Sequence, residues 1–228
     1  MKRWEELPAE MQIEEIRPYY DALSKKKMSL ALKRIFDIVV SAIMLVILSP
    51  VLVILAIAIK RDSPGPVFYR QVRVTQYGRK FKIHKFRSMC DGADKKGTLV
   101  TVGNDARVTR VGKVVRKFRI DEISQLIDVL AGDMTFVGVR PEVPKYVEKY
   151  QSEWNATFLL PAGVTNLTCI YYKDEDKLLE GSKDPDKTYV EEILPDKMKW
   201  HLKGIKEFSF IHDIKLMFMT FFAISGKE

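Results

Sequence analysis

Cysteine and histidine are scarce in this 228-residue chain, and their scarcity excludes several kinds of site. Cys90 and Cys169 lie far apart and form no CxxC pair, so they can build neither a disulfide framework nor a zinc ribbon. The three histidines show no HExxH motif and no i, i+4 spacing, which indicates surface or filler residues rather than metal ligands. A reducing compartment is the simpler interpretation of this cysteine usage.

The common nucleotide-binding loops are also missing. Neither GxxxxGK[ST] nor GxGxxG occurs, which disfavours a standard nucleoside triphosphatase or a dinucleotide-dependent enzyme. No internal repeat or low-complexity tract is present, and 46% of the residues are hydrophobic, so a wholly disordered chain is excluded.

The strongest local signal is an apolar run of 22 uncharged residues from Ile38 to Ile59. A helix of this length, at about 1.5 Å per residue, reaches across the core of a bilayer. Basic residues flank both ends, whereas a plain span carries more of them on its cytoplasmic side. Ser49-Pro50 lies in the middle and favours a bend that returns both ends to one side. The pattern leaves three alternatives: a kinked span, a re-entrant helical hairpin and a buried core helix.

The rest of the chain divides around this run. Residues 1–28 are polar and partly helical in pattern, which predicts a short surface helix and a linker. Strands over 67–75 and 80–86 are predicted to form a hairpin around Gln76-Tyr77-Gly78. Apolar spacing predicts a helix over 122–131 with a glycine stop at Gly132.

Two further helices are predicted near the C-terminus. One follows Pro141 and Pro144, where apolar residues recur at helical spacing. The other covers residues 208–224, which are crowded with aromatic and aliphatic side chains. It fits equally a helix in the membrane interface and a helix packed on the core.

Positive charge is concentrated directly after the apolar run. Between Lys60 and Ile120, 17 lysines and arginines stand against four aspartates, a net charge of +13 in a chain whose total is +8. A basic patch can hold a domain to anionic lipid. Nucleic-acid binding normally uses a recognisable reading helix or stacking aromatics, which are missing, so no nucleic-acid partner is expected. Neither account explains the acidic pair Asp121-Glu122 that ends the segment.

Asp121 has two alternative roles. An aspartate just before an apolar-periodic run is a favoured helix N-cap, and caps are far more common than catalytic carboxylates. Beside Arg116, Lys117 and Arg119, however, a carboxylate stays ionised and is a competent nucleophile toward phosphorus. A diphosphate with Mg²⁺ is the matching substrate, because Mg²⁺ binds one or two carboxylates together with phosphate oxygens.

Six blocks occur in a recognisable order. They are Lys33-Arg34 with Asp37, Ser49-Pro50, SPGPVFYRQVRV (63–74), FKIHKFRSM (81–89), RVTRVGKVVRKFRIDEISQL (107–126) and GDMTFVGVRPE (132–142). From about Ser29 to the C-terminus the chain thereby resembles the bacterial sugar transferase family, the monotopic phosphoglycosyl transferases of polyprenol-linked glycan assembly. It departs from the family's usual DELPQL and VGPRP at Ser124 and Val139.

The resemblance implies an α+β, helix-rich fold on the cytoplasmic face of the bacterial inner membrane. Residues 29–61 are then a re-entrant membrane helix-break-helix, and its break at Ser49-Pro50 sets the insertion depth. Residues 62–228 are the cytosolic catalytic domain, with a small β-hairpin and interfacial amphipathic helices that include 208–224. The lack of a multi-span N-terminal region indicates the small, catalytic-unit-only form. The oligomeric state stays open, a homodimer included.

The resemblance also implies a reaction: a phospho-sugar moves from a UDP-sugar to polyprenol (undecaprenyl) phosphate, and UMP is released. This is the first membrane step of capsule, exopolysaccharide or glycoconjugate synthesis. Asp121 is then the nucleophile and Mg²⁺ ligand, and Glu122 an auxiliary acid/base or positioning residue. The residues matched to phosphate binding are Arg116, Arg140, Pro141, Lys85 and Arg87. For Lys85 and Arg87 a structural role at a strand end is an equal alternative.

Two alternatives come from other functional classes. A non-catalytic membrane-tethered adaptor would bind anionic lipid or nucleic acid through its basic segment, and its salt-dependent binding would not change on altering Asp121. A single-span protein with an outside domain would place positions near 30 and 65 on opposite sides of the membrane.

Overall fold

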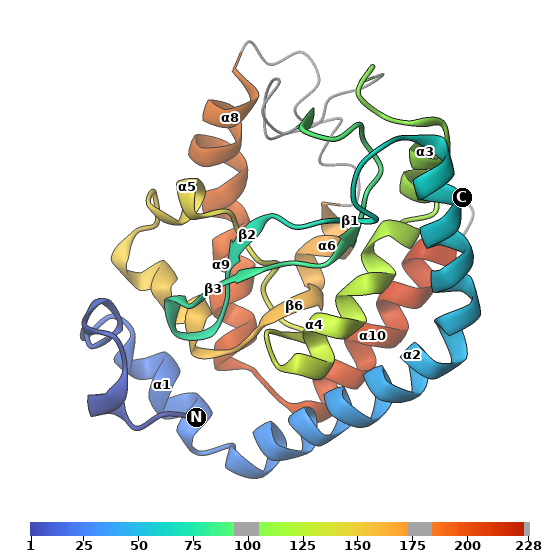
Figure 1. Ribbon diagram of the computed structural model, residues 1–228. Helices are drawn as coiled ribbons and strands as arrows, with labels where there is room; N and C mark the ends of the chain where they lie inside the picture. The colour runs from blue at the N-terminus through green and yellow to red at the C-terminus, as the bar shows by residue number, and fades with distance from the viewer. Residues whose placement is uncertain (94–104, 173–183, 226–228) are drawn as a thin grey trace.

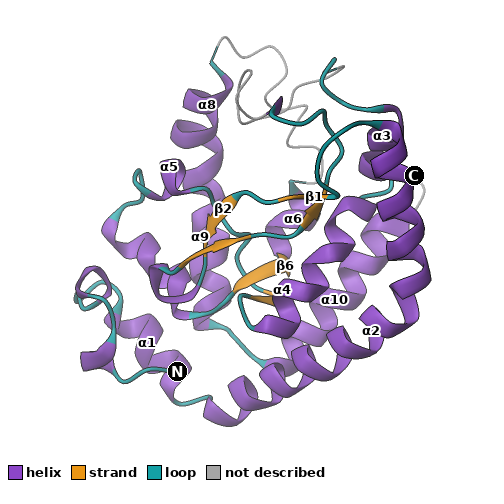
Figure 2. Cartoon of the chain, in the orientation of Figure 1, coloured by secondary structure: helices purple, strands orange, loops and turns teal. Residues whose placement is uncertain are grey.

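The computed structural model describes residues 1–93, 105–172 and 184–225. Within them the fold is α+β and helix-rich, as predicted, with two-stranded sheets at the centre and helices around them (Figure 1). Figure 2 shows how small the share of strand is beside that of helix.

The elements as far as the fifth strand are η1 (Trp4–Glu6), η2 (Ala9–Met11), α1 (Arg17–Ser24), α2 (Lys27–Asp62), β1 (Phe68–Tyr69), β2 (Val72–Val74), η3 (Gln76–Gly78), β3 (Lys80–Lys82), β4 (Lys85–Phe86), α3 (Arg110–Lys117), η5 (Ile120–Gln125), α4 (Leu126–Ala131) and β5 (Met134–Val137). They are followed by α5 (Pro144–Val147), η6 (Ser152–Leu159), β6 (Ala162–Thr165), α6 (Leu167–Tyr171), α8 (Pro185–Thr188), the π-helical turn η7 (Tyr189–Ile193), α9 (Leu194–Lys206) and α10 (Phe210–Ser225).

The predicted hairpin is confirmed, although its ladder is split into two short antiparallel pieces. Strand β2 pairs with β3, with Arg73 opposite Phe81, and β1 pairs with β4, with Phe68 opposite Phe86. The turn between them is η3, as Gln76-Tyr77-Gly78 predicted.

The third sheet joins β5 and β6 in parallel, with Met134 opposite Ala162. Gly138 and Gly163 make this pairing possible, because a Cβ built on Gly163 would lie 2.1 Å from the nitrogen of Gly138. This parallel sheet was not predicted from the sequence.

The helix predicted over 122–131 is present but begins differently. Residues Ile120–Gln125 form the 3₁₀ turn η5, and α-helical geometry starts only at Leu126. The helix ends at Gly132, whose φ of 88° gives the expected left-handed stop. The helix predicted behind Pro141 and Pro144 is the single turn α5.

The apolar run lies in α2, which is one continuous helix, so the predicted break at Ser49-Pro50 is wrong for the secondary structure. Pro50 has no N–H to donate to the carbonyl of Val46, and the Ser49 hydroxyl donates to that carbonyl instead, at 2.8 Å. This substitute hydrogen bond lets the chain stay helical through the proline. The helix changes direction along its length rather than breaking into two arms (Figure 1).

In α2 several polar side chains are buried and many apolar ones are exposed, the reverse of a helix on the surface of a water-soluble protein. Lys33, Asp37 and Ser41 are buried against the protein, whereas Val46 and Ile47 are 74% and 68% exposed. In the most apolar 18-residue stretch of α2, only 6% is buried inside the protein. The core-helix alternative is therefore wrong, and an uncovered apolar face suits contact with lipid.

The predicted C-terminal helix is α10, which packs beside α2 (Figure 1). Asp213 and Leu216 are buried, whereas Phe218, Phe221 and Phe222 are each more than 60% exposed. One face of α10 therefore packs on the core, and the other is apolar and uncovered.

The segment before α2 contributes to the core. Leu7, Met11, Ile16 and Leu23 are buried in one apolar cluster with residues of η6 and α9. The expected surface helix and linker are therefore corrected to a packed segment. A second cluster joins α4, β5 and α10, with half-buried side chains of α2 against it.

Two buried charged side chains fix α2 to β5 and α10. The Nζ of Lys33 donates to the carbonyl of Val137 and to the carboxylate of Asp213, each at 2.6 Å. The carboxylate of Asp37 accepts hydrogen bonds from Thr135 Oγ1, at 2.6 Å, and from the backbone N–H of Phe136, at 3.1 Å. These contacts set the register of α2 along β5.

Arg34 and Arg87 attach α2 to the elements beside it. The guanidinium of Arg34 donates to the carbonyls of Val129 and Leu130, at the C-terminal end of α4. Near the other end of α2, Arg87 donates to the carbonyls of Ser63, at 2.8 Å, and Pro64.

Asp213→Ala leaves the buried ammonium of Lys33 without its carboxylate. We expect a loss of about 3–5 kcal/mol in the free energy of unfolding, because an uncompensated charge stays buried. The matched control is Asp21→Ala, which breaks an exposed pair with Arg17 and costs about 1 kcal/mol or less. Denaturant unfolding in detergent micelles measures both. Equal losses in the two variants would contradict the role given to the buried pair.

Candidate active site

The acidic pair lies in η5, where basic side chains from two other segments meet it. Asp121 is 4% exposed, and its Oδ2 lies 2.9 Å from the Nζ of Lys85 on β4. The Nζ of Lys85 is also 3.5 Å from the Oε1 of Glu122. Arg140, in the loop after β5, donates to the same carboxylate of Glu122.

The charges at this pair determine the ionisation of Glu122. Burial by itself raises the pKa of Glu122, but the positive charges of Arg140 and Lys85 outweigh burial and hold that pKa well below its usual range. Glu122 in turn raises the pKa of Arg140. The site therefore keeps Glu122 as a carboxylate across the physiological pH range.

Asp121 is not a helix cap, so the capping alternative is wrong. The N-cap position of η5 is Arg119, with a φ of 53°, and Asp121 lies inside the first turn. A left-handed conformation is uncommon for a residue with a side chain and marks local strain. Strain of this kind clusters at functional sites, which agrees with a chemical role for the neighbouring carboxylates.

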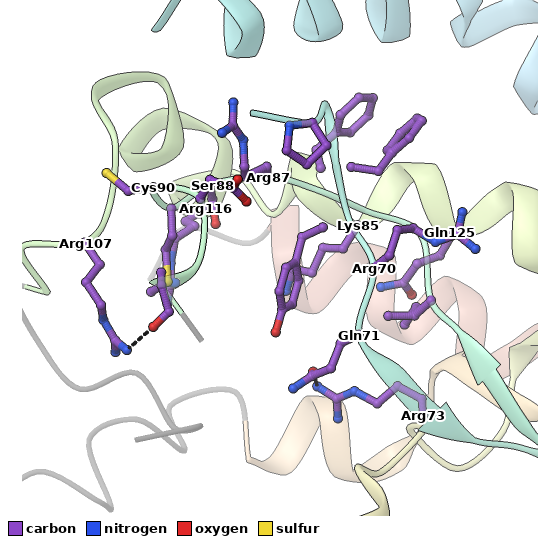
Figure 3. Close-up of a pocket in the computed structure, with 18 of the residues that line it drawn as sticks. Arg70, Gln71, Arg73, Lys85, Arg87, Ser88, Cys90, Arg107, Arg116 and Gln125 are labelled. Atoms are coloured by element: carbon purple, nitrogen blue, oxygen red, sulfur yellow. Dashed lines mark hydrogen bonds between the residues drawn. The ribbon is translucent and has the colours of Figure 1, made fainter. Parts of the chain in front are cut away.

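A cavity of about 600 Å³ adjoins the pair, since Lys85, Arg140 and Gln125 all line it. Figure 3 shows Arg107 on one side of this cavity, with Lys85 across from it and Gln71 and Arg73 below Lys85. The lysines and arginines that line the cavity are Arg70, Arg73, Lys85, Arg87, Arg107, Arg116 and Arg140. Asp91 is the one acidic residue among the described lining residues. Such a wall suits a ligand with several negative charges.

The predicted phosphate-binding residues all line this cavity, but their side chains are used differently. Arg116 reaches it from α3, and the buried Pro141 forms part of the wall while its carbonyl accepts from Arg73 at 2.9 Å. Lys85 contacts both acidic residues. The buried Arg87 is bound to the carbonyls after α2, which favours the structural alternative for this residue.

His201 is a filler residue, as predicted, whereas His84 has a specific partner. His201 is buried, and burial, together with the charge of Lys197, lowers its pKa to about 3. The ring and backbone N–H of His84 are bound to the carboxylate of Asp128. The position of His84 directly before Lys85 was the available signal, but the partner lies 44 positions away.

The residues present fit Mg²⁺ in one particular way. Among the described residues, no group of three or more His, Cys, Asp or Glu side chains could hold a metal ion by itself. Asp121 and Glu122 offer two carboxylates beside a cavity suited to phosphate. Mg²⁺ usually binds by one or two carboxylates and completes its octahedral shell with substrate phosphates and water.

The family model described as bacterial sugar transferase matches residues 28–227 of this chain. The chain belongs to the bacterial sugar transferase family. The match begins at residue 28, one residue before Ser29, where the resemblance was predicted to begin.

Three curated relatives show what members of the family do. UDP-glucose:undecaprenyl-phosphate glucose-1-phosphate transferases of Klebsiella pneumoniae and Caulobacter vibrioides are 34% and 32% identical to this chain, over 85% and 82% of its length. The alignments cover 40% and 67% of those proteins. UDP-N-acetylgalactosamine-undecaprenyl-phosphate N-acetylgalactosaminephosphotransferase of Aeromonas hydrophila is 45% identical over 54% of this chain and 29% of its own length. The chain thus spans less than half the length of two of these three relatives.

Arg140→Ala removes the charge that does most to lower the pKa of Glu122. A lowered pKa stabilises the fold above the ordinary value of 4.5, and this contribution is lost as the pH falls below that value. We expect the variant to be about 1–2 kcal/mol less stable near pH 7, after allowing for the partial exposure of Arg140. The deficit should stay constant down to about pH 4.5 and shrink only below it, as the pH approaches the depressed pKa of Glu122. Urea unfolding at a series of pH values from neutral to about pH 2.5 measures it.

The control for this experiment is Arg79→Ala, which breaks an exposed pair with Asp133 outside the cavity. It should show a small deficit with little dependence on pH. A deficit in Arg140→Ala that stays unchanged down to about pH 2.5 would contradict the role given to Arg140 in lowering the pKa of Glu122.

Proposed function

We propose that this protein transfers a sugar 1-phosphate from a UDP-sugar to polyprenol (undecaprenyl) phosphate, giving a polyprenol-diphosphate sugar and UMP. The observation that carries the proposal is the buried Asp121 beside Glu122, next to a cavity with a basic wall, in a member of the bacterial sugar transferase family. The undecaprenyl-phosphate sugar phosphotransferases among its relatives support the same reaction class. The product begins a capsule, exopolysaccharide or glycoconjugate.

The chemistry takes two displacements at one phosphorus atom. In the first, a carboxylate oxygen of Asp121 attacks the phosphorus that bears the sugar, the diphosphate bridge breaks, and UMP leaves with the bonding electrons. In the second, a phosphate oxygen of the polyprenol phosphate attacks the same phosphorus, and Asp121 leaves as a carboxylate. Both attacking groups are anions, so neither displacement requires a general base.

The other residues of the site stabilise charge. Lys85 and Arg140 lie next to the carboxylates, where the transferring phosphoryl group would sit. Arg116 lines the cavity and suits forked contacts to phosphate oxygens. Glu122 keeps Lys85 and Arg140 in place as their shared acidic partner.

Asp121, with Glu122 beside it, would hold Mg²⁺ against the diphosphate. The ion supplies neutralisation of the phosphate charge when bound. A shared site of this type depends on the substrate, because the two carboxylates are too few to hold the ion alone.

We propose a monotopic protein on the cytoplasmic face of the inner membrane. The outward apolar faces of α2 and α10 and the basic residues at both ends of α2 support it. A re-entrant course of α2 is supported by the change of direction along the helix and by the proline inside it. The adaptor alternative gives no reason to bury a carboxylate pair beside the basic cavity.

Asp121→Asn should reduce sugar-phosphate transfer to background, because an amide cannot displace UMP. UMP release is measured with the protein in lipid nanodiscs, Mg²⁺, undecaprenyl phosphate and a panel of UDP-sugars. The control is Asp133→Asn, which alters an aspartate paired with Arg79 outside the cavity and should stay active. Membrane association should persist in both variants. A fully active Asp121→Asn protein would contradict the role of Asp121 as the nucleophile.

The topology is tested with single cysteines after Cys90 and Cys169 are replaced by serine. Met28→Cys and Arg61→Cys place exposed thiols near the two ends of α2. For a re-entrant helix we expect both thiols to react with an impermeant maleimide only after the cells are opened. Labelling of one thiol in intact cells would instead identify a span.

A further inference from the structure

His84, directly before Lys85, is bound through its backbone and through both ring nitrogens. Its backbone N–H donates to Oδ2 of Asp128 at 2.8 Å, and its Nδ1 lies 2.6 Å from Oδ1 of the same carboxylate. The side chain of Asp128 is 1% exposed. The hydroxyl of Ser124 donates to the carbonyl of His84 at 3.0 Å. Helix α4 therefore binds His84 by its ring and its N–H, and η5, which carries the acidic pair, binds its carbonyl.

The other ring nitrogen of His84 contacts Arg70, a residue that lines the cavity. Its Nε2 lies 2.5 Å from Nη1 of Arg70, and Nη2 of Arg70 donates to the carbonyl of Lys82 at 2.8 Å. A guanidinium has only donors, so Nε2 of His84 must accept. The proton of the neutral ring is then on Nδ1, where it is donated to Asp128. The two contacts therefore select the tautomer of His84 that carries its proton on Nδ1, in the hydrogen-bonded chain Asp128–His84–Arg70.

Arg70 needs such an anchor. It is an exposed arginine that lines the cavity, and a long exposed side chain loses conformational freedom when it binds a ligand. His84 and the carbonyl of Lys82 use two of its five N–H donors and leave the others for a ligand. Arg70 and Lys85 line the same cavity (Figure 3), so a group bound at Arg70 would lie in the cavity that adjoins the acidic pair.

We propose that His84 is a positioning residue: through the chain Asp128–His84–Arg70 it holds the guanidinium of Arg70 ready for a phosphate oxygen of the sugar-nucleotide donor. Arg70 is then a donor-binding residue, and His84 acts only through it. This inference rests on the proposed function, because it takes the donor to be a UDP-sugar bound in the cavity.

Two substitutions separate the two ring contacts. His84→Asn keeps a donor near the place of Nδ1 and retains the contact with Asp128, but it has no acceptor for Arg70. His84→Gln keeps an acceptor near the place of Nε2. We expect KM for the UDP-sugar to rise about tenfold in His84→Asn and in Arg70→Ala, with kcat changed much less, and His84→Gln to recover most of the loss.

The double variant His84→Asn with Arg70→Ala decides whether His84 acts through Arg70. If it does, KM of the double variant equals that of Arg70→Ala alone, because the anchored group is already gone. A purely structural role for His84 would instead add a further loss. Arg79→Ala is the matched control, an exposed arginine outside the cavity that should leave KM unchanged. Thermal unfolding of each variant checks that it is folded.

A readout independent of activity is the tautomer of His84. In the full-length protein labelled with ¹⁵N-histidine, the ring of His84 is assigned by its loss in His84→Asn. A proton on Nδ1 supports the chain, and a proton on Nε2 overturns it.

The two proposals fail in different ways. Transfer by the wild type combined with additive losses in the double variant overturns the positioning role and leaves the proposed function intact. No transfer by the wild type with any UDP-sugar overturns the proposed function and the role of Arg70 in donor binding, while the tautomer still decides the hydrogen-bonded chain.

Discussion

The fold depends on how α2 satisfies its few polar side chains. Lipid accepts apolar side chains as well as a protein core does, so apolar packing alone does not fix a membrane-facing helix in one register. Hydrogen bonds do so here: Lys33 and Asp37 are bound to β5 and to Asp213 of α10, and Arg34 to the end of α4. Each of these groups is costly to bury without its partner, so the helix has one favourable position.

The site is built outward from that position. Strand β5 leads to the loop with Arg140, and α4 is preceded by η5, which carries Asp121 and Glu122. At the far end of α2, Arg87 binds the carbonyls after the helix and belongs to the segment that holds Lys85. These contacts therefore link the apolar helix to the acidic pair. In the proposed function this linkage holds the nucleophile at a fixed height for the phosphate of a membrane-bound substrate.

Features that depend on neighbouring residues could be predicted from the sequence. The hairpin around Gln76-Tyr77-Gly78 and the stop at Gly132 were predicted, because turn chemistry and glycine conformations are local. Other features could not be predicted, because one side chain changes the outcome of a local rule. Ser49 supplies a hydrogen bond to the carbonyl that Pro50 leaves without its usual donor, so the helix continues. Left-handed Arg119 takes the cap position that was one of two alternatives for Asp121.

The sequence by itself determined the apolar run, the basic segment, the acidic pair and the family to which they belong, since each is written in residues close together along the chain. Only the tertiary structure decided which charges meet. Asp128 binds His84, and Lys85 forms an ion pair with Asp121. Arg87 binds backbone carbonyls, although the sequence made it a candidate for phosphate binding. These contacts join positions more than 20 residues apart, where no local period or spacing carries a signal, and burial makes each depend on the packing of the whole domain.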